Sequence, residues 1–133
     1  MYLRFIAPGW EIRRGVDRGL FGPAYYHARD TETPESIARA LWHEIYWFED
    51  ELPVPRRGAF QVRSKRRWRS HGICWFRDDA RAMIAHAHVL AALLHELGVP
   101  VTRHVTHRPG TILYRDAWQI VAKPDAATPT RWH

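Results

Sequence analysis

Arginine and lysine residues stand together with Phe60 and Trp68 in one part of this 133-residue chain, and no acid interrupts them. The acid-free stretch runs from residue 52 to residue 77 and holds eight of the 20 basic residues. Without those eight the chain has 12 basic against 14 acidic residues, a net charge of −2, whereas the whole chain carries +6. Positive charge gathered in this way indicates a binding surface rather than a requirement of folding.

The chemistry open to this stretch is the recognition of phosphate groups. Cations presented along one segment can bind successive phosphates, and an aromatic ring among them can stack on a base. We therefore predict a basic loop or arm at 56–71 that binds a polyanion, above all nucleic acid, either DNA or RNA. The predicted contact residues are Arg56, Arg57, Arg63, Lys65, Arg66, Arg67, Trp68 and Arg69.

Short basic runs are weak motifs, and the same stretch has a second reading. It could be a solvated loop whose arginines pair with acids of the preceding helix. Those acids are Glu44, Glu49, Asp50 and Glu51. The two readings differ in one observable, which is whether the guanidinium groups face solvent or internal carboxylates.

Aromatic side chains on the expected helix at 33–51 suggest a second kind of surface. Trp42 and Tyr46 are four residues apart and so share one side of that helix. Burial against a short helix bearing Tyr25 and Tyr26 would explain them. The alternative function is a protein-interaction module or homodimer that uses Trp42 and Tyr46 as partner-binding residues.

Nine histidines raise the question of a metal site, but their spacing does not support one. His86 and His88 point in different directions on a helix, and His88 and His95 lie roughly 10 Å apart along its axis. The sequence has no HExxH motif and no Cys/His quartet. We predict no metal ligand and no cofactor.

No catalytic residue is assigned, and on balance the chain does not read as an enzyme. Cys74 stands in an apolar run, which indicates a buried, inert thiol. A further alternative is a small metal-independent enzyme acting on RNA or nucleotides. Its test set on the last strands is Arg103, His107, Tyr114 and Arg115.

The elements that must position these residues alternate between strands and helices. Apolar spacing predicts two main helices, about 33–51 and about 78–97, with Thr33 and Asp78 as caps and Gly98 ending the second. Pro23 begins a short helix to about residue 29. Strands are predicted at 2–6, 59–63, 73–76, 101–107, 111–114 and 118–123, with loops at 11–22 and 63–71. The fold class is α+β: two layers, with both main helices packed on one face of a mostly antiparallel sheet of about four to five strands.

Length and composition place the chain in one domain, residues 1–133, with a tail from about 124 that we expect to fray. A single cysteine excludes an intrachain disulfide. No apolar run resembles a signal peptide or a membrane span, so we expect a cytoplasmic protein without a membrane partner. Arginine makes up 18 of the 20 basic residues, as in GC-rich genomes, and we expect a bacterial source.

Overall fold

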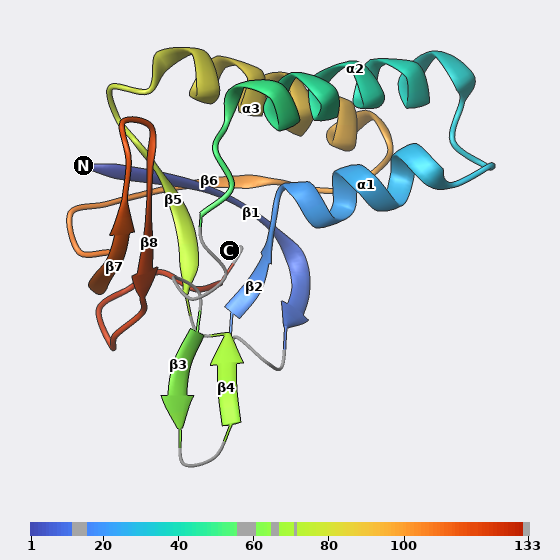
Figure 1. Ribbon diagram of the computed structural model, residues 1–133. Coiled ribbons are helices and arrows are strands. Elements are labelled where there is room, and N and C mark those ends of the chain that lie inside the picture. Colours follow the sequence, from blue (N-terminus) through green and yellow to red (C-terminus); the bar gives the residue numbers. More distant parts are fainter. Residues whose placement is uncertain (12–15, 56–60, 65–66, 71, 132–133) are drawn as a thin grey trace.

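The computed structural model describes residues 1–11, 16–55, 61–64, 67–70 and 72–131, and these form a mixed α+β fold (Figure 1). The helices are α1 (Phe21–Arg29), α2 (Glu35–Glu51) and α3 (Arg81–Glu96). The strands are β1 (Tyr2–Glu11), β2 (Val16–Gly19), β3 (Gln61–Ser64), β4 (Arg67–Ser70), β5 (Ile73–Arg77), β6 (Thr102–Thr106), β7 (Thr111–Arg115) and β8 (Gln119–Lys123). None of the described helices is both long and apolar enough to cross a membrane.

Six strands form one antiparallel sheet, and β1 organises it. Tyr2 pairs with both β5 and β6, so these two strands lie on opposite edges of β1. Ile6 pairs with both β2 and β6, so β2 also lies on the edge away from β6. Beyond β5 follow β8 and then β7. One edge of β1 is therefore shared by two strands, β5 near its start and β2 further along.

The helices cover the sheet because each carries an apolar stripe at helical spacing. As predicted, Leu41, Ile45 and Phe48 of α2 are buried, and so are the following residues of α3: Met83, Ala87, Leu90 and Leu94. They form one core cluster with Phe5 of β1 and Phe76 of β5. Figure 1 shows α2 and α3 running side by side over the sheet. Helix α1 follows β2 and packs against α2.

A smaller apolar cluster is distinct from this core. Ile73 and Trp75 of β5 pack there against Ile120 and Ala122 of β8, which are their register partners. Alternate residues of a strand point to opposite faces, so Cys74 and Phe76 belong to the face that the helices cover. The interior position of β5, between β1 and β8, agrees with the central strand predicted at 73–76.

The sheet has more strands than predicted. The stretch 11–22, expected to be a loop, contains β2, and the basic run 63–71, also expected to be a loop, contains β4. Both strands are four residues long and polar, so neither carries the apolar alternation that marks a strand in a sequence. Their pairing with β1 and β3 is what makes them strands.

The two predicted helix caps are wrong. Thr33 donates its hydroxyl to the His27 carbonyl at 2.6 Å, and α2 begins after Pro34, whose carbonyl accepts the first helical N–H groups. Asp78 lies in the turn before α3 and contacts the N-terminal amino group at 3.7 Å. The predicted end of α3 is confirmed, because Gly98 follows it with a φ of 80° that favours glycine.

The last described segment, residues 124–131, lies against the body of the protein. Thr128 is buried, and its hydroxyl contacts the carboxylate of Asp125 and the carbonyl of Arg108. Asp125 in turn accepts the backbone N–H of Ala127. These contacts close a turn beside the start of β7.

Candidate functional site

The basic segment forms an antiparallel hairpin. Strands β3 and β4 pair with each other and make a two-stranded sheet separate from the main one. Val62 lies opposite Arg69, and Arg63 lies opposite Trp68. Figure 1 shows this hairpin extending beyond the main sheet, on the side away from α2 and α3. We call residues 61–70 the basic arm.

The arm gathers part of the predicted contact set. Because alternate positions of a strand belong to one face, positions 67 and 69 share a face, and positions 63 and 68 share the other. Arg56, Arg57, Lys65 and Arg66 lie outside the described residues. For Arg63, Arg67, Trp68 and Arg69 the structure describes the backbone pairing. The role of all eight residues stays a prediction.

Contacts of Glu49 and Arg77 relate to the alternative hypothesis, in which the arginines of the acid-free stretch pair with acids of the protein itself. Glu49 of α2, one of the acids proposed as partners, accepts a hydrogen bond from the Tyr25 hydroxyl of α1. Arg77, the last cation of the stretch, contacts Asp79 at 3.4 Å and donates to the Asp116 carbonyl at 3.2 Å. Arg77 therefore serves the fold and is no part of the arm.

The aromatic side chains of α2 divide into a packed ring and an exposed one. Trp42 packs edge-on against Tyr25 of α1 and donates its indole N–H to the Ala28 carbonyl at 3.1 Å. Tyr46 stacks on Trp42, with ring centroids 5.4 Å apart, and is 56% exposed. Trp42 thus joins α1 to α2. Its proposed role, and that of Tyr46, in binding a partner stays a prediction.

The four residues proposed for an enzyme do not come together. Arg103 lies on β6 and His107 just after it, whereas Tyr114 and Arg115 lie on β7. Strands β1, β5 and β8 separate β6 from β7, a distance of roughly 19 Å at about 4.8 Å per strand. The Tyr114 hydroxyl instead donates to Asp116 at 2.9 Å.

One histidine, His86, joins two helices. His86 of α3 contacts the buried carboxylate of Glu44 at 2.5 Å and stacks on Trp47, with ring centroids 3.5 Å apart. This contact joins α2 to α3. Among the described residues, no group of three or more His, Cys, Asp or Glu side chains is placed to hold a metal ion.

A pocket of about 380 Å³ opens in the main sheet, and the sequence reading did not find it. It lies at the shared edge of β1, where Arg4 and Phe5 stand between the register with β5 and the register with β2. The segment after α2, residues 52–55, forms another wall and runs down between β5 and β2 in Figure 1. A pocket of this size is within the range of about 300–1,000 Å³ typical of small-molecule sites.

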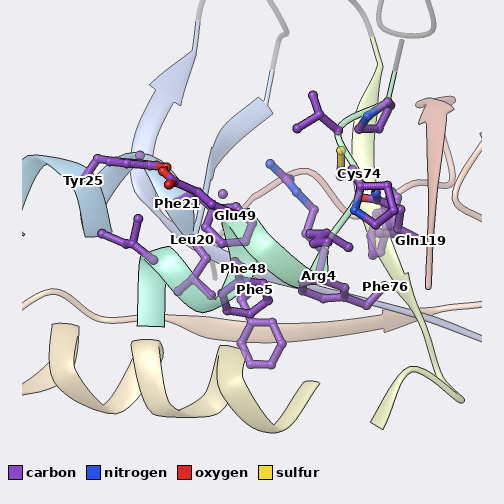
Figure 2. Close-up of a pocket in the computed structure, with 18 residues that line it drawn as sticks. Arg4, Phe5, Leu20, Phe21, Tyr25, Phe48, Glu49, Cys74, Phe76 and Gln119 are labelled. Atoms are coloured by element: carbon purple, nitrogen blue, oxygen red, sulfur yellow. Dashed lines mark hydrogen bonds between the residues drawn. The ribbon is translucent and has the colours of Figure 1, made fainter. Parts of the chain in front are cut away.

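Aromatic rings make up much of the pocket lining, and a few polar groups are set among them. The rings belong to Phe5, Phe21, Phe48 and Phe76. The polar side chains are those of Arg4, Tyr25, Glu49, Cys74 and Gln119. Figure 2 shows the Arg4 side chain rising between Glu49 on one side and Cys74 and Gln119 on the other.

Hydrogen bonds hold the polar groups around the rim. Gln119 donates to the Pro53 carbonyl at 2.7 Å and to Asp116 at 3.1 Å, which ties the segment after α2 to β8. The bond to Glu49, with burial second, raises the pKa of Tyr25 above its ordinary value. Burial alone would raise the pKa of Asp116. Hydrogen bonds from the backbone N–H groups of Trp118 and Gln119, and from the Tyr114 and Gln119 side chains, outweigh it and lower that pKa.

Comparison with protein-family models, curated proteins and solved structures finds no match to this chain. One signal in the sequence could have located the pocket, namely an arginine at position 4 within an otherwise apolar strand. A charged side chain is rarely buried unless it is paired with an opposite charge or held by hydrogen bonds. An arginine at such a position therefore indicates a polar site next to the strand.

Proposed function

We propose that this protein binds nucleic acid through the basic arm. The observation that carries the proposal is that two described pieces of the acid-free stretch, Gln61–Ser64 and Arg67–Ser70, pair with each other in a two-stranded sheet apart from the main sheet. A segment built only to complete the core would pair with that sheet. A projecting one can reach a ligand.

The shape of the arm favours a duplex. A two-stranded antiparallel ribbon is one of the two elements that the major groove of B-DNA admits. Each strand of the arm has four residues and is therefore roughly 13 Å long. Positions 67 and 69 share one face, which would place two arginines toward the same side of the groove.

Charge supports the same conclusion. The region from 52 to 77 contains eight cations and no acid, while the rest of the chain sums to −2. Attraction to a polyanion would therefore orient the protein with its arm first. Contacts of this kind release counterions, so affinity falls as salt rises.

The test is a salt titration of binding to a short labelled DNA duplex, followed by fluorescence anisotropy. The arm variant replaces Arg66, Arg67 and Arg69 with alanine. For each lost phosphate contact, the slope of log K against log salt should flatten by about 0.9, hence by up to about 2.7. The affinity at low salt should fall with it.

A matched control separates the arm from total charge. Arg81, Arg108 and Arg115 are exposed and lie elsewhere, so changing these three to alanine removes the same charge. The control variant should keep nearly the whole slope. Equal slopes for wild type and arm variant, both folded by circular dichroism, would overturn the proposal. A labelled single strand in parallel shows which form of nucleic acid is preferred.

A further inference from the structure

The pocket at the shared edge of β1 has no part in the function proposed for the arm. Its walls combine flat rings of β1, α1, α2 and β5 with polar groups of β8 and of the segment after α2. We propose that it binds a small, neutral aromatic molecule of one or two rings that carries an N–H or O–H group, as indoles and phenols do. The amide oxygen of Gln119 accepts the hydrogen bond from that group.

Gln119 supplies an acceptor that the protein itself leaves unused. Both N–H groups of its amide are taken, one by the Pro53 carbonyl at 2.7 Å and one by the Asp116 carboxylate at 3.1 Å. Because both partners can only accept, they fix which way round the amide lies and direct its oxygen away from them. None of the described residues donates a hydrogen bond to this oxygen.

This acceptor belongs to the pocket. Gln119 is 2% exposed and is the register partner of Phe76, so both side chains project from one face of the sheet, and both line the pocket. The oxygen stays accessible, whereas the indole N–H of Trp75 is sealed from solvent. A nearly buried acceptor without a donor costs free energy, and a donor on a ligand would remove that cost.

The segment after α2 adds acceptors rather than donors. Pro53 and Pro55 have no backbone N–H, so residues 53–55 offer only that of Val54 beside their carbonyl groups. Glu49, at the rim, is a further acceptor, and its carboxylate receives the Tyr25 hydroxyl. Such a lining favours a ligand that donates hydrogen bonds.

The charges of the pocket favour a neutral ligand. Arg4 is 6% exposed and Glu49 is exposed, so the lining carries one charge of each sign. A cation would be repelled by the first and an anion by the second. Arg4 already interacts within the protein, so we assign it no ligand contact.

The rings of the pocket set the shape of the ligand. Phe48 lies edge-on to Phe21, with ring centroids 5.0 Å apart, and stacks with Phe76 at 6.2 Å. Flat rings in such arrangements leave spaces suited to another flat ring. With a volume of about 380 Å³, the pocket has room for a molecule the size of an indole. Figure 2 shows Gln119 at one end of this space and Phe21 at the other.

The first experiment compares two isomers that differ in one donor. 3-Methylindole has a free N–H, whereas 1-methylindole carries its methyl group on that nitrogen. The isomers are equal in mass and nearly equal in size, so a difference in Kd reports the hydrogen bond. In titrations followed by ligand NMR signals, 3-methylindole should bind about 3- to 10-fold more tightly, the range for one hydrogen bond between neutral groups.

The single cysteine locates the bound probe. Cys74 is half-buried and lines the pocket, and no other thiol is present in the chain. Alkylation by iodoacetamide, a small neutral reagent, should slow in proportion to occupancy by 3-methylindole. Mass spectrometry of the intact protein measures the rate.

A pair of glutamine variants assigns the hydrogen bond. Gln119→Met keeps a side chain of similar length without the acceptor, so the two isomers should bind it with equal affinity. Gln61→Met makes the same change in β3 and should keep the difference between them.

A pair of glycine variants tests the space itself. A Cβ at Gly19 would lie 3.7 Å from Nη2 of Arg4, an ordinary contact, so Gly19→Ala should bind both isomers as wild type does. Gly19→Leu extends further into the pocket and should weaken both isomers alike.

The wild-type comparison decides the proposal even where Gln119→Met fails to fold. Equal affinity for the two isomers, or binding of neither, would overturn it, as would unchanged Cys74 alkylation at saturating 3-methylindole. The alanine variant at Arg66, Arg67 and Arg69 should bind 3-methylindole as wild type does. Loss of binding in that variant would place the site on the arm, and the proposal would fail while the function proposed for the arm would not.

Discussion

The basic arm and the pocket place positive charge in opposite ways. The arm collects many cations close together in a hairpin that stands apart from the main sheet. The pocket has one arginine, 6% exposed, on a strand paired along both edges. Several cations in one segment suit a long, repetitive ligand such as nucleic acid, whereas a single buried charge can meet only one ionised group.

The same contrast extends to stability. Side chains of the pocket wall are also side chains of the core, so binding and folding draw on the same contacts there. Strands β3 and β4 pair with each other and not with the main sheet, so we expect substitutions in the arm to leave the core intact.

The largest effect concerns the pocket wall. Phe48 is 4% exposed and packs against both Phe21 and Phe76. Phe48→Ala should lower the free energy of unfolding by about 3–5 kcal/mol, through lost burial and the cavity that remains. Urea denaturation followed by circular dichroism measures the change.

The arm variant at Arg66, Arg67 and Arg69 is the counterpart of this experiment. It should shift the free energy of unfolding by less than about 0.5 kcal/mol, as surface changes do. A destabilisation comparable to that of Phe48→Ala would show that the arm belongs to the core, and the comparison of the two regions would then fail.

A smaller effect is expected where β7 turns into β8. Asp116 accepts the backbone N–H groups of Trp118 and Gln119 and also holds the Gln119 side chain at the pocket rim. Since these bonds lower the pKa of Asp116 in the folded state, its ionised form stabilises the protein above about pH 4. Asp116→Asn should cost about 1 kcal/mol at neutral pH.

The difference in the free energy of unfolding between wild type and Asp116→Asn should decrease as the pH falls. As pH falls through the folded pKa, wild-type Asp116 is protonated and its advantage over the asparagine variant disappears. Unfolding curves for the two proteins should therefore converge in acid. Asp79→Asn, which changes an exposed carboxylate, is the control and should differ little from wild type at any pH. A gap that persists in acid would assign the effect to packing.

The smallest effect is expected on the outer surface of α2. Tyr46 is 56% exposed and stacks on Trp42, so Tyr46→Ala should cost about 0.5 kcal/mol. Tyr26→Ala removes a ring that is 64% exposed and is the matched control. Light scattering should give the same mass for both variants and wild type. A dimer that dissociates only in Tyr46→Ala would instead favour the interaction-module hypothesis.

Sequence reasoning predicts the elements that have strong local signals. The apolar faces of α2 and α3 follow from helical spacing, and the end of α3 follows from Gly98. Strands β2 and β4 escape it because they are polar and depend on tertiary pairing. The predicted caps are wrong because Thr33 and Asp78 have partners outside the helices they precede.

Of the candidate sites, the arm can be found from the sequence, whereas the arginine at position 4 is the single sequence signal that points to the pocket. The cations of the arm lie close together in the sequence, so the charge pattern reveals them. The pocket joins residues near positions 4, 20, 48, 75 and 119, which only the strand order brings together. A single sequence cannot show that two strands share one edge of β1, and this shared edge creates the space.

The shared edge of β1 has a consequence for how the protein could evolve. The hollow results from where β5 and β2 pair along β1, so its existence depends on backbone pairing more than on particular side chains. Residues at its rim, such as Gly22, Val54 and Cys74, can then be exchanged while the hollow persists. Descendants of one ancestral fold could thus vary the lining of this hollow without rebuilding their architecture.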